Sequence, residues 1–156
     1  KSGHLAGAAI DVYPEEPESN SDGFVTPLQG LPNVILTPHI GGSTAEAQAA
    51  IGREVATSLV KYIDGGATAG SVNFPGVELA PIPGTHRILN AHRNVPGVLR
   101  DINRIVSDTD ANILGQMLAT DADIGYLVMD IARDVSDAIS AAMAALPTNI
   151  RTRVLY

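Results

Sequence analysis

The 156-residue chain contains no cysteine and no tryptophan. Without cysteine it can form neither a disulfide nor a thiolate metal site. Only 4% of its residues are aromatic, so a core has to be built from aliphatic side chains. No run approaches the roughly 20 apolar residues that a membrane-spanning helix needs, and no signal peptide is recognisable. These absences predict an intracellular, cytoplasmic protein.

Basic residues are also scarce, with 10 Lys and Arg against 17 Asp and Glu and a net charge of −7. This charge disfavours binding to nucleic acid or to an anionic membrane. The four histidines lack the spacing with carboxylates that metal ligands show, so no metal site is predicted. A hydrophobic content of 45% is typical of a folded globular protein. Because the chain starts at Lys1 and enters an apolar pattern at once, we expect it to be a piece of a longer polypeptide.

In the first half, Ala8–Val12 and Val34–Leu36 are short apolar runs typical of buried parallel strands. The segment between them is rich in Pro, Gly and acids, which predicts a long functional loop. Ser43 and Glu46 form a capping-box pattern. The helix predicted after it ends near Gly65 and has an apolar residue every four positions. This stripe consists of Ile51, Val55, Leu59 and Ile63.

Residues 67 to about 85 carry three prolines and no helical period, which predicts a linker with one short extended segment at Ser71–Phe74. We place a first domain at residues 1–74, a linker at 75–85 and a second domain at 86–156. The elements of the second domain are a strand over Arg87–His92, a helix opened by Pro96, strands over Ile113–Thr120 and Ile124–Ile131, a helix capped by Asp134 and a last strand over residues 150–154.

This β-α-β-β-α-β order predicts a ferredoxin-like α/β fold. A domain of about 70 residues is small for a solitary core, so we expect it to pair with a second copy. Ile88–Ala91 is the segment expected to lie at the sheet edge and to extend the sheet across a twofold axis.

Four segments, "AAIDVYPEEP", "TPHIGGSTAEAQ", "SVNFP" and "HRNVPGVL", occur in this order. Together they resemble the phosphoglycerate-oxidising members of the D-2-hydroxyacid dehydrogenase family, from Leu5 to Tyr156. The resemblance implies a C-terminal remnant of a Rossmann-like nucleotide-binding domain followed by an ACT domain. It also implies NAD as cofactor and 3-phosphoglycerate as substrate, in the biosynthesis of L-serine.

The resemblance assigns His39 and Glu16 to a catalytic pair. Oxidation of a 2-hydroxy acid needs a base for the hydroxyl proton, and imidazole titrates near neutral pH. A neighbouring carboxylate would orient the ring and favour the imidazolium. Spacing alone cannot choose Glu16 over Glu15 or Glu18, and it equally allows His39 to be an ordinary turn residue.

The resemblance further places Asp11 near the nicotinamide and the backbone of Ile40, Gly41 and Gly42 beside the cofactor. The sequence contains no Gly-x-Gly-x-x-Gly turn for a pyrophosphate, and the family's substrate-binding arginine precedes the matching segment. We therefore expect this chain alone to be inactive as a dehydrogenase.

For the second domain, the resemblance implies an L-serine effector site between two ACT copies, within a tetramer. The matching residues are His92, Asn94 and Asn112. From the residues alone they could equally be a strand end, a pre-helix cap and a turn. Gly84 and Thr85 stand where the best-known relatives have two glycines, and Thr is the stiffer residue. Two alternative functions are a stand-alone amino-acid-sensing module and a scaffold that only dimerises.

Overall fold

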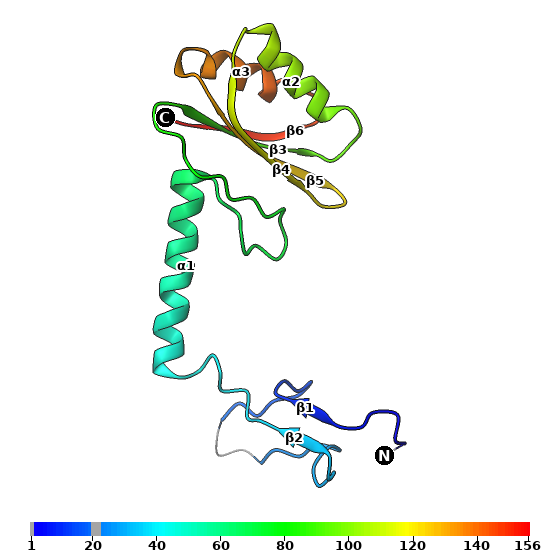
Figure 1. The fold of residues 1–156 in the computed structure, drawn as a ribbon. Coiled ribbons are helices and arrows are strands. Elements are labelled where there is room, and N and C mark those ends of the chain that lie inside the picture. Colours follow the sequence, from blue (N-terminus) through cyan, green and yellow to red (C-terminus); the bar gives the residue numbers. More distant parts are fainter. Residues whose placement is uncertain (1, 20–22) are drawn as a thin grey trace. The chain divides into compact units, whose positions relative to one another are not determined.

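The computed structural model describes residues 2–19 and 23–156 and divides the chain into two units, Lys1–Arg53 and Glu54–Tyr156 (Figure 1). The division falls inside a helix, whereas the boundaries expected at residues 74/75 and 85/86 stay predictions. Part of the predicted loop after the first strand, residues 20–22, lies outside the described residues. None of the described helices has the length and apolar character that crossing a membrane requires.

The first unit is built around a parallel pair of short strands, β1 (Ala8–Ile10) and β2 (Val34–Leu36). The parallel pairing is as predicted, but β1 ends at Ile10 rather than Val12. Neither strand is fully buried, and no described residue up to Arg53 is. Parallel strands are usually covered on both faces. In this chain both strands are instead partly exposed, and the prediction that they are buried is wrong.

Helix α1 (Ala45–Gly65) follows β2, but its cap differs from the predicted capping box. The Ala47 N–H donates to Thr44 Oγ1 at 3.1 Å, so Thr44 is the capping residue and not Ser43. The Ser43 N–H instead closes a turn on the Ile40 carbonyl at 3.0 Å. The apolar stripe of α1 stays partly exposed, between 47% at Ile51 and 55% at Leu59.

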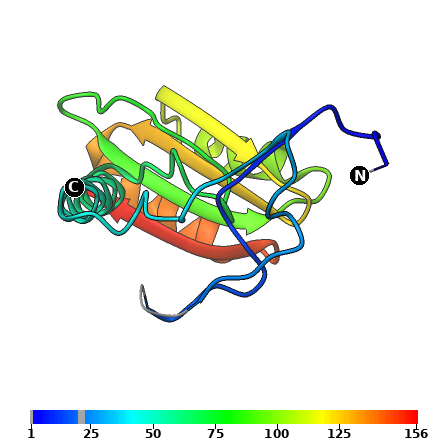
Figure 2. The same cartoon turned by 90° about the horizontal axis from the view of Figure 1, so that it is seen from below.

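The second unit is a four-stranded antiparallel sheet with two helices on one face (Figure 1). Its elements are β3 (His86–Arg93), α2 (Val98–Asp108), β4 (Ile113–Thr120), β5 (Ile124–Ile131), the 3₁₀ turn η1 (Arg133–Val135), α3 (Ser136–Ala144) and β6 (Asn149–Leu155). The predicted β-α-β-β-α-β order is confirmed. Figure 2 shows the strands side by side in the order β4-β5-β3-β6, from yellow through orange and green to red.

This strand order overturns the expectation that Ile88–Ala91 forms a sheet edge. β3 pairs with β5 on one side and with β6 on the other, so its ladder is satisfied on both sides. In the ferredoxin-like topology the first strand lies inside the sheet, and β4 and β6 are the edges.

Both helix starts in this unit also differ from the prediction. α2 begins at Val98, after Gly97 with a φ of 94°, a left-handed conformation that favours glycine. Pro96 therefore lies before the helix and does not occupy its first position. Asp134 lies in η1, and α3 begins at Ser136 without a side-chain cap.

The sheet has two covered faces. Under the helices, the core contains Ile88, Ile102, Leu127, Met129, Ile131, Ile139 and Met143. On the other face, Leu89, Tyr126 and Val128 pack with Val77, which is only 1% exposed, and with Phe74. Residues expected to form a linker thus pack against the sheet.

The extended segment predicted at Ser71–Phe74 is absent from the structure, in which residues 72–74 form a bend. Thr68 explains the difference, because its Oγ1 donates to the Pro75 carbonyl at 2.7 Å and accepts from the Val77 N–H at 2.9 Å. These bonds close residues 68–77 into a loop held by its own polar groups.

Arg87 joins residues 79–80, the end of α1 and the sheet. Its Nε and Nη2 donate to the two carboxylate oxygens of Asp130, both at 2.7 Å. Nη1 donates to the carbonyls of Gly65 and Leu79 at 2.9 and 2.8 Å, and Nη2 also donates to that of Ala80 at 2.9 Å. All five guanidinium N–H groups are thereby used. Arg87 and Asp130 are 6% and 1% exposed.

Gly66 follows α1 with a φ of 72° and lies against the same sheet. A Cβ at this position would collide with the Leu89 side chain and approach the Tyr126 hydroxyl. That hydroxyl donates to the Gly66 carbonyl at 2.8 Å, and burial raises the pKa of Tyr126 to about 12. The end of α1 is therefore fitted closely to the sheet.

We expect Arg87→Met to lower the free energy of unfolding of the second unit by about 3–5 kcal/mol, because it leaves the buried Asp130 carboxylate unpaired. Chemical denaturation followed by circular dichroism measures the change. Lys61→Met is the control, since it breaks an exposed ion pair with Glu78 and should leave the transition nearly unchanged. Equal transitions for the two variants would contradict the anchoring role of Arg87.

Candidate functional sites

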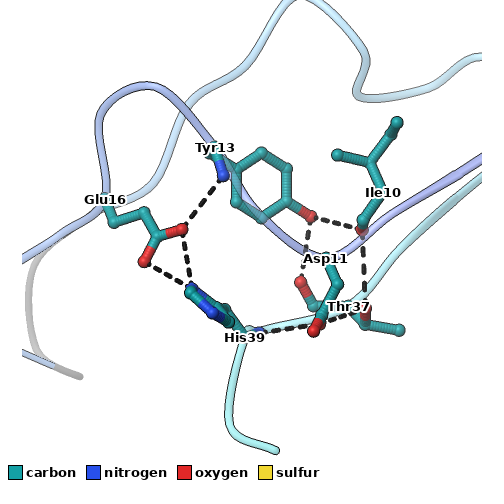
Figure 3. Close-up of polar contacts among 6 residues, drawn as sticks. All are labelled: Ile10, Asp11, Tyr13, Glu16, Thr37 and His39. Carbon is teal, nitrogen blue, oxygen red and sulfur yellow. Dashed lines mark hydrogen bonds and ion pairs between the residues drawn. The ribbon is translucent and has the colours of Figure 1, made fainter. Parts of the chain in front are cut away.

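Polar side chains gather where the two parallel strands of the first unit end (Figure 3). Asp11 directly follows β1, and Thr37 directly follows β2. Asp11 Oδ1 accepts from the Thr37 hydroxyl at 2.5 Å and from the His39 N–H at 3.0 Å. The carboxylate thereby holds the backbone of His39, whose φ of 51° is unusual for a residue with a side chain.

Glu16 and His39 form an ion pair in which Nδ1 of the ring lies 2.8 Å from both carboxylate oxygens. The Tyr13 N–H donates to Glu16 Oε1 at 3.0 Å and holds the carboxylate in place (Figure 3). Of the three acids that the sequence left open, the structure brings Glu16 to the histidine. With Nδ1–H directed at the carboxylate, Nε2 is the ring nitrogen that remains to exchange a proton.

The contacts among His39, Glu16 and Asp11 raise the pKa of the histidine and lower those of the two acids. The hydrogen bond that Glu16 accepts from the ring, followed by the negative charge of Glu16, raises the pKa of His39. The Tyr13 N–H, followed by the hydrogen bond with His39, lowers the pKa of Glu16. The Thr37 hydroxyl does most to lower the pKa of Asp11. At neutral pH both carboxylates are therefore ionised, and the Glu16 carboxylate stabilises the protonated form of His39.

Tyr13 and Thr37 complete the arrangement, and neither was predicted as a site residue. The Tyr13 hydroxyl lies 3.0 Å from the Ile10 carbonyl and 2.9 Å from the Thr37 carbonyl, and so links the ends of both strands. Its ring meets Phe24 edge to face at 4.7 Å. The position of Thr37 in the sequence could have indicated its role. Thr37, like Asp11, directly follows a strand of the parallel pair, and ligands bind at the carboxyl ends of such strands.

A cleft of about 790 Å³ lies beside the ion pair. Its lining includes Tyr13, Glu16, Phe24, Leu36, Pro38 and His39. His39 is accessible from this cleft, because its side chain is 45% exposed. The arrangement can therefore offer an acid/base group to a small molecule.

Ile40, Gly41 and Gly42 continue the chain away from His39. Ile40 is 54% exposed, and a Cβ at either glycine would meet no atom within 4 Å. Neither glycine has a positive φ. Neither packing nor backbone conformation in this chain therefore requires glycine at positions 41 and 42. Glycine at both positions would allow an external group to approach the backbone closely.

The three residues matched to an effector site fall at two ends of the second unit's sheet. His92, at one end of β3, pairs with Gly125, and Asn94 follows it. Asn112 precedes β4, whose first residue pairs with Ile131 at the opposite end. One copy therefore brings His92 and Asn94 to the same end and leaves Asn112 at the other.

His92 is 3% exposed, and burial lowers its pKa. Asn94 is exposed, and its Nδ2 donates to the Asp121 carbonyl at 2.7 Å. Asn112 is exposed as well. Two of these three residues are thus engaged with their own chain, His92 through Asn90 and Asn94 through the β4–β5 turn.

We expect Glu16→Gln to lower the pKa of His39, because the variant removes both the charge and the ionic hydrogen bond that raise it. A proton NMR titration of the His39 ring in the 156-residue chain measures the midpoint. Glu15→Gln is the matched control and should leave that midpoint in place. An unchanged midpoint in Glu16→Gln would contradict the pairing.

Two family models match the chain. Residues 1–41 match the NAD-binding domain of the D-isomer specific 2-hydroxyacid dehydrogenases, and residues 88–151 match the ACT domain of the type found in the AHAS small subunit. Among solved structures, the C-terminal domain of MgtC from Mycobacterium tuberculosis aligns at 14% identity over 48% of this chain and 90% of that chain. Its TM-score of 0.38 is too low to support an argument.

Several curated relatives match almost the whole chain. A D-3-phosphoglycerate dehydrogenase of Dictyostelium discoideum is 56% identical over 100% of this chain, and one of Escherichia coli K12 is 53% identical over 99%. D-3-phosphoglycerate dehydrogenase 2 of Saccharomyces cerevisiae is 50% identical over 85% of the chain and is covered over 30% of its own length. The chain spans 38% of the length of the first two. It therefore belongs to the D-2-hydroxyacid dehydrogenase family, with D-3-phosphoglycerate dehydrogenases as its relatives, and its residues 88–151 form an ACT domain.

Proposed function

We propose that this chain supplies the acid/base part of an NAD-dependent active site that oxidises 3-phospho-D-glycerate to 3-phosphohydroxypyruvate in L-serine biosynthesis. The observation that carries the proposal is the Glu16–His39 pair, with Nδ1 at 2.8 Å from the carboxylate, beside a cleft at the ends of two parallel strands. The match of residues 1–41 to an NAD-binding domain and the names of the relatives support the same chemistry.

In the proposed reaction, the substrate carbon loses a hydride and its hydroxyl loses a proton. NAD, when bound, provides the hydride acceptor. His39 Nε2 takes the hydroxyl proton while Nδ1–H stays bonded to Glu16, whose charge stabilises the imidazolium that forms. Asp11 keeps the ring in position by holding the His39 N–H at 3.0 Å. In the reverse direction the same imidazolium returns the proton.

The residues that would lie along NAD are Asp11, His39, Ile40, Gly41 and Gly42. The open space around the two glycines allows an external ring or ribose to reach the backbone. Asp11 has its pKa lowered and stays ionised, so that a carboxylate lies close to the proposed nicotinamide position.

The proposal is tested in a chimaera in which this chain replaces the matching segment of the Escherichia coli relative, 53% identical over 157 residues. NADH formation from 3-phosphoglycerate is measured. His39→Gln should lower turnover by about 100- to 10,000-fold, the usual contribution of a positioned acid/base. Glu16→Gln should move the rise of the rate with pH to lower pH, because the neutral ring is the base and its pKa falls.

Glu15→Gln serves as the control for both variants, since the structure pairs His39 with Glu16. Near-normal turnover of His39→Gln would return His39 to the role of a turn residue. A folded chimaera that binds L-serine but forms no NADH would favour a stand-alone amino-acid-sensing module.

For the second unit we propose an effector site for L-serine between two ACT copies. His92 and Asn94 of one copy would then meet Asn112 of the other, in keeping with their separation at opposite ends of the sheet in a single copy. The small size of the domain supports pairing, and β4 and β6 are the sheet edges through which copies could associate. A homo-tetramer in the cytoplasm is the assembly we propose.

A further inference from the structure

A chain of polar side chains lies buried beside β3 and leads to His92. Asn90, 1% exposed, donates from Nδ2 to Asn149 Oδ1 at 2.9 Å and to Thr152 Oγ1 at 2.8 Å. Asn90 Oδ1 faces His92 Nδ1 at 2.9 Å. Asn149 Nδ2 in turn donates to the Ala144 carbonyl at the end of α3, at 3.2 Å.

A β-bulge makes this chain of contacts geometrically feasible. Asn149 and Thr152 are three residues apart, so in a regular strand their side chains would point to opposite faces. The register between β3 and β6 shifts between Ala91 and His92, and this shift places Asn149 opposite His92. As a result the Thr152 hydroxyl reaches Asn149 Oδ1 at 2.8 Å, and both side chains meet Asn90.

The direction of every hydrogen bond in this chain follows from one backbone carbonyl. The Ala144 carbonyl can only accept, so Asn149 must present Nδ2 to it and Oδ1 to Asn90. Asn149 Oδ1 also can only accept, so Asn90 must present Nδ2 there and Oδ1 to His92. His92 Nδ1 therefore carries the proton, and in the neutral ring Nε2 is the unprotonated acceptor.

Nε2 of His92 lies over Gly125 of the neighbouring strand, where a Cβ would collide with it. This atom shares no hydrogen bond with a described residue, and it is not fully enclosed, because every fully enclosed side-chain nitrogen and oxygen in the described part of the chain has a partner. Asn94 offers a second acceptor, because its Nδ2 is bonded to the Asp121 carbonyl and Oδ1 is the amide atom that remains for another partner. Two acceptors thus lie at this end of the sheet.

We infer that Asn90, oriented by Asn149 and Thr152, is a positioning residue of the effector site that holds His92 in the Nδ1–H form, so that the site selects a ligand bearing N–H donors such as the ammonium group of an amino acid. The inference deepens the proposed L-serine site and rests on it for the identity of the ligand. The lowered pKa of His92 supports it, since a neutral imidazole is required for Nε2 to accept. An imidazolium at this position would instead repel an ammonium group.

Two measurements on the 156-residue chain test the inference. Long-range proton–nitrogen NMR of the His92 ring distinguishes a protonated from an unprotonated ring nitrogen without any ligand. Calorimetry measures the affinity for L-serine and for 3-hydroxypropionate, which has the hydroxyl and carboxylate of serine but no ammonium group. The unchanged chain should show Nδ1 protonated and Nε2 unprotonated, and should bind 3-hydroxypropionate at least about tenfold more weakly than L-serine.

Asn90→Leu, of similar size, removes the acceptor for Nδ1–H. It should release the ring from its single protonated form and weaken L-serine binding by about 10- to 100-fold. Thr152→Val and Thr152→Ser form a matched pair in case Asn90→Leu does not fold. The valine variant removes an acceptor of Asn90 and should show part of both effects, while the serine variant keeps the hydroxyl and should show neither. Asn103→Ala is the control, since that amide pairs with Gln116 and not with His92.

An unchanged chain with Nε2 protonated would overturn the inference. So would Asn90→Leu or Thr152→Val variants that keep both the Nδ1–H form and full affinity. If the Nδ1–H form is present and depends on Asn90, but the chain binds no L-serine, the positioning role stands and the proposed effector is wrong.

Discussion

The buried guanidinium of Arg87 is the contact on which the arrangement of the second unit depends. It joins the carbonyl that ends α1, two carbonyls of the following loop and the Asp130 carboxylate on β5. A buried cation is tolerated only when its donors are satisfied, and here all five are. The contact therefore ties the α1 end and residues 79–80 to the sheet, and Gly66 and Tyr126 add a second close fit.

The two proposed sites share one arrangement, a hydrogen bond at Nδ1 of a histidine, with opposite effects on the pKa of the ring. In each, an acceptor binds Nδ1 of an imidazole and thereby leaves Nε2 for another molecule. At His39 the acceptor is the Glu16 carboxylate, which raises the pKa of an exposed ring and prepares it to take a proton. At His92 the acceptor is the neutral Asn90 amide in a buried position, where burial lowers the pKa and favours a ring that only accepts a hydrogen bond.

Much of the fold could be predicted from sequence, because the mostly apolar run of β5 and the spacing of apolar residues in α2 reflect burial directly. The parallel pairing of Ala8–Ile10 with Val34–Leu36 followed from the same reasoning. Helix starts failed, since Thr44 and Ser43 are chemically equivalent caps and only the backbone decides between them. The edge role given to Ile88–Ala91 failed because local pattern carries no information on strand order.

Fewer of the site residues than of the fold elements could be predicted from the sequence itself. Glu16 and His39 came from resemblance, and the structure brings them within 2.8 Å, but nothing local separates Glu16 from Glu15. Tyr13 and Asn90 were missed, because their roles depend on partners distant in sequence: Thr37 for Tyr13, and Asn149 and Thr152 for Asn90. The burial of Val77 could not be predicted for a similar reason, since it depends on the sheet face formed later in the chain.

The central proposal is that one chain supplies both an acid/base pair and an effector domain that would control it. The most direct test is the rate of NADH formation from 3-phosphoglycerate by the chimaera with the Escherichia coli relative, measured over a range of L-serine concentrations. The account predicts a rate that falls as L-serine rises, and a loss of this response in Asn94→Ala with little change in the rate without serine. A rate that is the same at every L-serine concentration would contradict it.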